Sequence, residues 1–180
     1  MPQYTYEALL NAPNPTASAA ALASSAALTD ISPVPQLILP ANYMQPGKVF
    51  RLTAAGVFSN TATPTLLIGF YIGGVAGAAI AASGAITTIT AATAWSWIAQ
   101  VSFQVRTIGT SGTIFPFAGG LLMPASLTAF QAKYPIPAAA PAAVTVDTTA
   151  AKAVTVGAQW GTSSASNTVT CHAFTVEDIA

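Results

Sequence analysis

The pair of residues that best fits a nucleophile and its base is Cys171 next to His172, the only cysteine and the only histidine of the chain. An imidazole activates a thiol only when the two lie within hydrogen-bonding distance. Residues 167–176 are rich in Thr and Val, which predicts a β-strand, and neighbouring side chains of a strand point to opposite faces. We therefore predict a buried cysteine beside an ordinary strand histidine, and not a catalytic pair.

The carboxylates are too scattered for acid–base catalysis. They are Glu7, Asp30, Asp147, Glu177 and Asp178, and of these only the last two are neighbours in the sequence. General acid–base chemistry needs groups positioned within reach of one substrate, and we interpret the terminal pair as a solvated chain end. A structural zinc needs about four Cys or His ligands. We predict no catalytic residue, no cofactor and no metal, and therefore no enzyme.

A glycine-rich run at residues 72–77 follows an apolar stretch, as a dinucleotide-binding turn would. The run reads Ile-Gly-Gly-Val-Ala-Gly, so it departs from G-x-G-x-x-G at the first glycine. No acidic residue follows at the distance of about 20 residues that such a site requires. We interpret the run as a turn between two strands.

Charge is scarce in this chain of 180 residues, in which only 6% are Asp, Glu, Lys or Arg and the formal net charge is zero. Ordinary proteins have about 25%. The five Lys and Arg residues cannot neutralise many phosphates, so we exclude nucleic acid as a partner. A surface with so little charge is poorly protected from association. We expect either that copies of the chain or other partners cover this surface, or that Thr, Ser, Asn and Gln solvate it. The longest stretch concerned lies between Arg51 and Arg106, where no charged residue occurs.

From residue 36 onward the pattern is that of short strands separated by Gly, Pro, Ser and Asn. Residues 97–105 alternate apolar and mostly polar side chains, and residues 65–72 form a nearly continuous apolar run between Pro64 and Gly73. The other expected strands are 36–39, 48–57, 113–118, 144–147, 152–159 and 167–176. This pattern predicts an all-β fold, a jelly-roll-like β-sandwich over residues 36–180. We expect residues 119–143 to be a long irregular connection that contacts a partner.

Residues 1–35 differ in composition, being rich in Ala, Ser and Pro, and we interpret them as an extended or partly helical N-terminal arm. Asn14 and Pro15 suit a helix start, so a short helix over 15–28 and a disordered low-complexity tail are both open. We expect the arm and the 119–143 connection to supply the interface. The candidate residues are Tyr4, Tyr6, Leu9, Leu10, Leu22, Leu28, Phe130 and Tyr134.

Two other classes were weighed. Residues 65–82 are long enough to span a bilayer, but no cluster of Lys or Arg flanks them and Gly and Thr interrupt them at strand-like intervals, so we expect no membrane. A sugar-stacking platform is the second alternative, built from Trp95, Trp97, Trp160, Tyr71 and Tyr134. We favour core packing for these rings, because Trp97 lies on the apolar face of its predicted strand.

The segment 39–58 carries a resemblance to a known group of proteins. Its Pro46-Gly47-Lys48 followed by apolar residues and Arg51, then Thr-Pro-Thr-Leu at residues 63–66 and a later strand with tryptophan, resembles small jelly-roll virion proteins of tailed bacteriophages. The resemblance covers about residues 36–178. It implies a capsid decoration (cement) protein, made in the host cytoplasm, that binds the major capsid protein on the outer surface of the virion as a homotrimer. A tail or fibre component and a carbohydrate-binding adhesin module are the alternatives.

Overall fold

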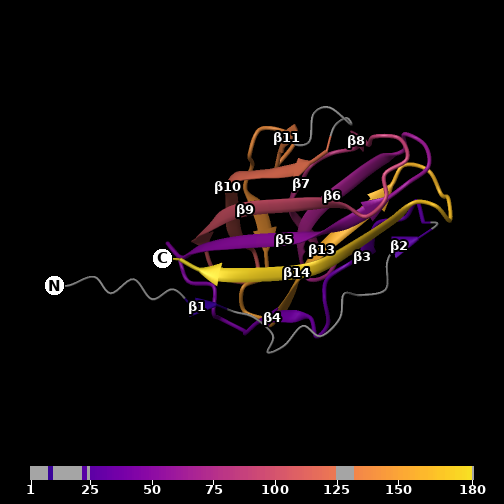
Figure 1. The fold of residues 1–180 in the computed structure, drawn as a ribbon. Helices are drawn as coiled ribbons and strands as arrows, with labels where there is room; N and C mark the ends of the chain where they lie inside the picture. The colour runs from indigo at the N-terminus through magenta and orange to yellow at the C-terminus, as the bar shows by residue number, and fades with distance from the viewer. Residues whose placement is uncertain (1–7, 10–21, 24, 125–131, 180) are drawn as a thin grey trace.

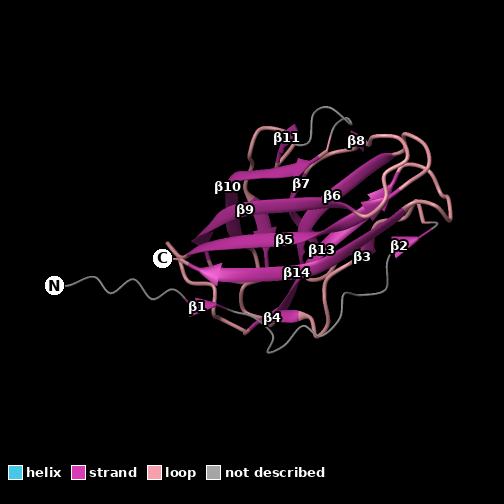
Figure 2. Ribbon diagram, viewed as in Figure 1, coloured by secondary structure: helices cyan, strands magenta, loops and turns pink. Residues whose placement is uncertain are grey.

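The computed structural model describes residues 8–9, 22–23, 25–124 and 132–179, and every regular element among them is a β-strand. Two antiparallel sheets lie one behind the other with a single hydrophobic core between them (Figure 1). No helix occurs in the described residues (Figure 2). The predicted all-β class and the two-sheet sandwich are thus confirmed.

The larger sheet has the order β1-β14-β5-β9-β10-β11, with β2 also on β14 and β12 also on β10. Its strands are β1 (Ala8–Leu9), β2 (Leu22–Ala23), β5 (Val49–Ser59), β9 (Trp95–Thr107), β10 (Gly112–Met123), β11 (Ala132–Pro135), β12 (Val144–Val146) and β14 (Thr168–Asp178). The smaller sheet has the order β3-β13-β6-β7, with β4 on β13 and β8 on β6. Its strands are β3 (Thr29–Asp30), β4 (Leu37–Leu39), β6 (Thr65–Ile72), β7 (Ala78–Ala82), β8 (Ile86–Thr87) and β13 (Lys152–Trp160).

The strand pairs are nested along the chain. The innermost pair is β6 with β7, and β5 with β9 encloses it. Next come β3 and β4 with β13, and then β1 and β2 with β14. Successive pairs alternate between the smaller and the larger sheet. The hairpin β9–β10 with β11 and β12 extends the larger sheet beyond this nested set.

The core forms because the long strands alternate in side-chain character. Along β9, Trp97, Ala99, Val101, Phe103 and Val105 are all buried, as the sequence pattern predicts. On β5 the same period places phenylalanines and a leucine inside, whereas its outward positions carry a mixture of polar and small apolar side chains. The stacked rings of Phe50 and Phe103, with centroids 5.2 Å apart, join these two neighbouring strands inside the sandwich.

The expected irregular connection at 119–143 is wrong over part of its length. The strand β10 continues to Met123, and β11 pairs with it from Gly120↔Pro135 to Met123↔Ala132. The sequence pattern does not indicate strands here because the segment is rich in glycine and proline, and both residue types are depleted from strands. Cross-strand pairing at the sheet edge supplies the order that local propensity does not indicate.

The described part of residues 15–28, over which a short helix was one of two expectations, contains no helix. Leu22–Ala23 form the strand β2, and residues 25–28 have no helical turn, while residues 15–21 and 24 lie outside the described residues. Pairing of Leu22 with Val169 and burial of its side chain in the core outweigh the helix propensity of the alanine-rich sequence.

The glycine-rich run is a turn between strands, as predicted. It joins β6 to β7, and Gly73 and Gly74 have positive φ angles of 86° and 80°. Only glycine adopts such angles without strain. Among the described residues, none belongs to a helix of the length and hydropathy needed to cross a membrane.

Candidate functional site

Cys171 and His172 do not form a catalytic pair. Cys171 is fully buried and His172 is exposed, because they occupy successive positions of β14. Burial raises the pKa of the Cys171 thiol to about 12. A thiol becomes a good nucleophile when its pKa is lowered towards neutrality, so this one is protected from reaction. The predicted arrangement on opposite faces is confirmed.

The terminal carboxylates differ from the solvated chain end that the sequence suggested. Asp178 is buried, with 5% of its surface exposed, and its Oδ2 accepts a 2.8 Å hydrogen bond from the Tyr43 hydroxyl. The same oxygen pairs with the Nζ of Lys48, which lies 3.9 Å from the centre of the Tyr43 ring. Glu177 faces outward and pairs with Arg51 at 3.3 Å. The expectation is therefore wrong for Asp178, which belongs to a structural cluster.

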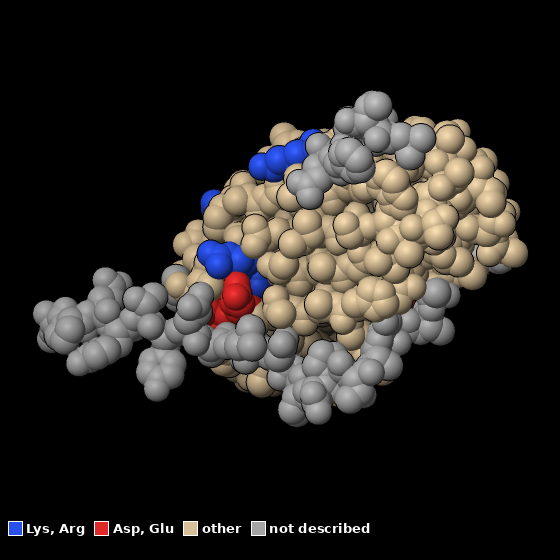
Figure 3. Space-filling model, viewed as in Figure 1, with Lys and Arg blue, Asp and Glu red and all other residues tan. Residues whose placement is uncertain are grey.

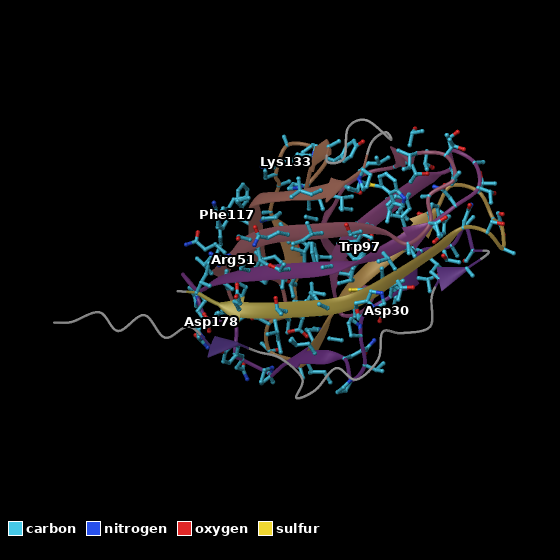
Figure 4. The ribbon with its side chains drawn as sticks, in the orientation of Figure 1. Asp30, Arg51, Trp97, Phe117, Lys133 and Asp178 are labelled. Carbon is cyan, nitrogen blue, oxygen red and sulfur yellow. The ribbon has the colours of Figure 1, made fainter. Side chains whose placement is uncertain are left out.

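Charged side chains gather at one end of the sandwich, where β5 begins and β14 ends. The residues of this charged end are Lys48, Arg51, Arg106, Asp147, Lys152, Glu177 and Asp178. Red and blue atoms lie together there in Figure 3, and Figure 4 places Arg51 and Asp178 at that end and Trp97 farther along the sheet. Acidic and basic groups pair with each other at this end, so it has little unbalanced charge to attract a charged ligand.

The opposite end is neutral and rich in hydroxyl groups. Its loops at residues 60–64, 88–94 and 161–167 contain no charged residue. Buried Asn60 joins the first two loops, since its Nδ2 donates to the Thr88 hydroxyl at 2.7 Å and its Oδ1 accepts from the Ala92 amide at 3.1 Å. A hollow of about 200 Å³ between the loops is lined partly by Thr61, Thr63, Thr162 and Asn167. Among the residues that the structure describes, none with an aromatic ring lines this hollow.

Between the charged end and the neutral end, the outer face of the larger sheet shows a broad area without red or blue atoms in Figure 3. In its middle, Ile98 on β9 lies directly opposite Leu122 on β10, and Ile98 is 41% exposed. We call this pair the Ile98–Leu122 ridge. A hollow of about 340 Å³ lies on one side of the ridge, over Gln100, Ser102 and residues 118–120, with Lys133 at its rim.

A second hollow, of about 230 Å³, adjoins the same ridge towards the neutral end. Ile98 and Leu122 line both hollows, and the second one adds Ala55 and Gly56 of β5 and Ser96 of β9. Each lining contains several small residues, residues 118–120 in the larger hollow and Ala55, Gly56 and Ser96 in the smaller one, beside the branched side chains of the ridge. The surface therefore has a raised apolar centre between two depressions.

The predicted interface residues are not gathered in one place. Leu9 and Leu22 pair with opposite ends of β14, and Leu22 is buried in the core. Leu28 is half-buried just before β3, and Tyr134 lies on β11 at the far edge of the same sheet, packed against the core. Tyr4, Tyr6, Leu10 and Phe130 lie outside the described residues.

The aromatic residues pack into the core and do not assemble a platform. Trp97 and Trp160 are almost completely buried, Tyr71 is 6% exposed, and Trp95 and Tyr134 pack against the core from different strands. The indole nitrogens of Trp97 and Trp160 have no hydrogen-bond partner within the described part of the chain. The favoured core interpretation is confirmed for these rings.

Sequence reasoning missed the Ile98–Leu122 ridge. The available signal was that Ile98 is the one large apolar residue on the otherwise polar outer face of its strand, beside Gln100, Ser102 and Gln104. Leu122 was placed in an irregular connection, so its position opposite Ile98 could not be inferred. Only the pairing of β9 with β10 brings the two together.

Comparisons of this chain with protein-family models, with curated proteins and with solved structures give no match. Inference about function therefore depends on the geometry and on the sequence. Within the described residues, no three His, Cys, Asp or Glu side chains lie close enough together to hold a metal ion. The most developed surface feature is the outer face of the larger sheet, whose neutral and shaped surface suits association with another protein surface.

Proposed function

We propose that this chain is a structural virion protein that decorates and stabilises the outer surface of a tailed-phage capsid. It acts as an oligomer, for which a homotrimer is the expected form, and its partners are the major capsid protein and copies of itself. The observation that carries the proposal is the combination of a two-sheet sandwich with a broad, neutral outer face. The sequence resemblance to jelly-roll virion proteins is the reason for placing the chain on the outer surface of a capsid.

The jelly-roll assignment is part of the proposal, and the nesting of the strand pairs supports it. A jelly roll is a double-sheet fold of eight antiparallel strands in two Greek keys. A long hairpin that is rolled into a sandwich gives nested strand pairs that alternate between the two sheets. Four such pairs occur here: β6–β7, β5–β9, β4–β13 and β1–β14. The β10–β12 segment is then an insertion before β13.

The distribution of charge also supports a role in assembly. Ion pairs at the charged end are satisfied within the chain, as for Lys48 with Asp178 and Arg51 with Glu177. The remaining broad surface relies on Thr, Ser, Gln and Gly for its contact with water. Such a surface is costly for a lone molecule at high concentration and suits one that is covered in a particle.

The test is attachment to capsids that lack this protein. Purified chain added to undecorated particles should co-sediment with them at a fixed number of copies, and imaging of the particles should show added density on the head. Density on the tail instead would favour the tail or fibre alternative. Absence of co-sedimentation at saturating protein would refute the decoration role.

The contribution of the N-terminal arm needs a careful deletion. Removal of residues 2–35 would also remove Leu22 and Ile31 from the core and the Ser32 hydroxyl that accepts from the Val156 amide. Deletion of residues 2–21 spares all three groups. We expect this shorter deletion to weaken attachment while circular dichroism and the thermal midpoint stay close to those of the full chain. Unchanged attachment would remove the arm from the proposal.

The adhesin alternative has lost its main support. Stacking of sugars needs exposed ring faces, and Trp97 and Trp160 are inside the core. The hollow at the neutral end offers hydroxyl and amide groups without an aromatic surface. We therefore propose no carbohydrate-binding function.

A further inference from the structure

We propose that the outer face of the larger sheet binds a second copy of this chain, with the Ile98–Leu122 ridge of one copy seated in a hollow beside the ridge of the next. The inference rests on the proposed function for the existence of an oligomer, and it adds the surface that joins the copies. The surface comprises the ridge, the two adjoining hollows and the surrounding outward residues of β5, β9 and β10.

Shape is the first argument for a second copy. A protein surface that carries both a projection and a depression can associate with copies of itself, and around a threefold axis each copy offers its projection to one neighbour and its depression to the other. Here the same two side chains, Ile98 and Leu122, form the projection and line the depressions on both sides of it. The hollows have volumes of about 340 and 230 Å³. Either one has room for a branched aliphatic side chain.

Charge is the second argument, because a neutral surface excludes strongly charged partners. Around the ridge the face presents Ala55, Ser96, Gln100 and Ser102, none of which carries charge. Two charged groups border this area: Lys133, exposed at the rim of the larger hollow, and Arg51, which lies opposite Ser102 and is paired with Glu177. Apolar centres with polar rims are typical of protein interfaces. Because Arg51 is already paired with Glu177 and Lys133 lies exposed at the rim, the centre of this surface can be covered by a second copy without burying an unpaired charge.

Size is the third argument. The three strands β5, β9 and β10 lie side by side, and β5 and β9 are joined over ten residue pairs. With strands about 4.8 Å apart and about 3.3 Å per residue, this area measures roughly 14 by 33 Å, or on the order of 480 Å² before side-chain relief is added. Stable interfaces bury about 800 Å² on each partner. The face is therefore large enough to supply most of a specific contact.

The decisive variant is Ile98→Asp, measured in the full-length chain by sedimentation velocity over a range of micromolar concentrations. Wild-type protein should sediment as an oligomer, and Ile98→Asp should raise the dissociation constant on the order of 100-fold, because the new carboxylate would be buried against an apolar surface. The matched control is Ile38→Asp. Ile38 is 60% exposed on β4 of the other sheet, and its substitution should leave the oligomer unchanged.

A second measurement tests the face without depending on the ridge. Gln100→Cys places a thiol in the larger hollow, whereas Thr61→Cys places one at the neutral end, and Cys171 is fully buried. Maleimide should label the cysteine at position 100 at least about 10-fold more slowly in the oligomer than in the diluted monomer, in line with burial of an interface centre. Labelling at position 61 should be the same in both.

The outcomes separate this inference from the proposed function. A wild-type chain that sediments as a monomer throughout, an Ile98→Asp variant that remains oligomeric, or equal labelling at position 100 in both states would overturn the interface. Capsid attachment is measured independently of these results. An oligomer that Ile98→Asp dissolves but that never attaches to capsids would refute the decoration role and leave the interface standing.

Discussion

The ammonium group of Lys48, immediately before β5, contacts the carboxylate of Asp178, the last residue of β14. The two residues are 130 positions apart in the sequence, and their contact closes the seam between the two strands at the charged end. The Tyr43 hydroxyl donates to the same carboxylate. A buried acceptor shared by two donors in this way stabilises the end of the sandwich and fixes the C-terminal strand.

Removal of this carboxylate should be costly. Asp178→Ala leaves the Lys48 ammonium and the Tyr43 hydroxyl without their shared acceptor in a partly buried site, so we expect a loss of about 2 kcal/mol in the free energy of unfolding. Urea unfolding followed by tryptophan fluorescence measures it. Asp147→Ala is the comparison: Asp147 pairs with Lys152 at 3.8 Å and accepts hydrogen bonds from Thr149 within its own surface turn, so its loss should cost clearly less than that of Asp178. Equal effects of the two substitutions would contradict the role given to Asp178.

The same cluster predicts a loss of stability at alkaline pH. Burial and the hydrogen bond to Asp178 raise the pKa of Tyr43 above its ordinary value of 10.0. Burial lowers the pKa of Lys48, but the hydrogen bond and the charge of Asp178 outweigh it and leave that pKa raised. Both groups hold their protons more tightly in the folded state, so their stabilisation is complete below the unfolded-state pKa values and is lost as pH rises through the folded-state values.

We therefore expect the free energy of unfolding to be steady near neutral pH and to fall above about pH 10. Denaturant titrations at a series of pH values measure the slope. Asp178→Asn is the matched variant, since it keeps the shape of the side chain and removes its charge. It should show a shallower alkaline decline than the wild type, and an identical decline would exclude the cluster as a source of the effect.

The strands β5 and β14 approach each other so closely at Gly56 that no side chain fits at this position. A Cβ at this position would lie 1.9 Å from the Thr170 carbonyl oxygen and 2.9 Å from the Cys171 Cα, both of them backbone atoms. Gly56→Ala must therefore separate the two strands, and we expect a loss of about 3 kcal/mol in a thermal or urea titration.

Gly74→Ala provides the comparison for this substitution. Gly74 has a φ of +80° and nothing within 4 Å of an added Cβ. Gly74→Ala should lower the free energy of unfolding only by the strain of an alanine with a positive φ, about 1 kcal/mol. A Gly56→Ala protein as stable as Gly74→Ala would show that the strands separate freely at this point.

Local pattern in the sequence was enough to identify the central strands. Residues 97–105 and 65–72 were recognised because apolar alternation and flanking Pro and Gly act over a few positions. The strand β7 is made mostly of alanine, which has little strand preference, and it exists because it pairs with β6. Such strands depend on a partner distant in the sequence, so local pattern does not indicate them.

The candidate surface was only partly predictable for the same reason. The absence of charge between Arg51 and Arg106 pointed correctly to a neutral part of the molecule. It could not show that Ile98 lies opposite Leu122, because that depends on the register of the β9–β10 hairpin and on its bulge between Pro116 and Ala118. Nor could it show that Asp178 turns inward, since its partners Tyr43 and Lys48 lie 135 and 130 positions earlier in the sequence.

Cys171 offers a direct probe of the seam between β5 and β14. Its side chain is fully buried opposite Gly56, and burial raises the pKa of the thiol to about 12, so a thiol reagent can react only when the strands open. We expect labelling of the native chain to be at least about 100-fold slower than labelling in denaturant. If the reactive state is the unfolded chain, Asp178→Ala should accelerate native labelling about 30-fold, which corresponds to its loss of about 2 kcal/mol. Asp147→Ala, which removes only contacts of a surface turn, should accelerate labelling far less. A rate that none of these substitutions alters would mean that the thiol is reached by a local opening that does not involve the charged end of the seam.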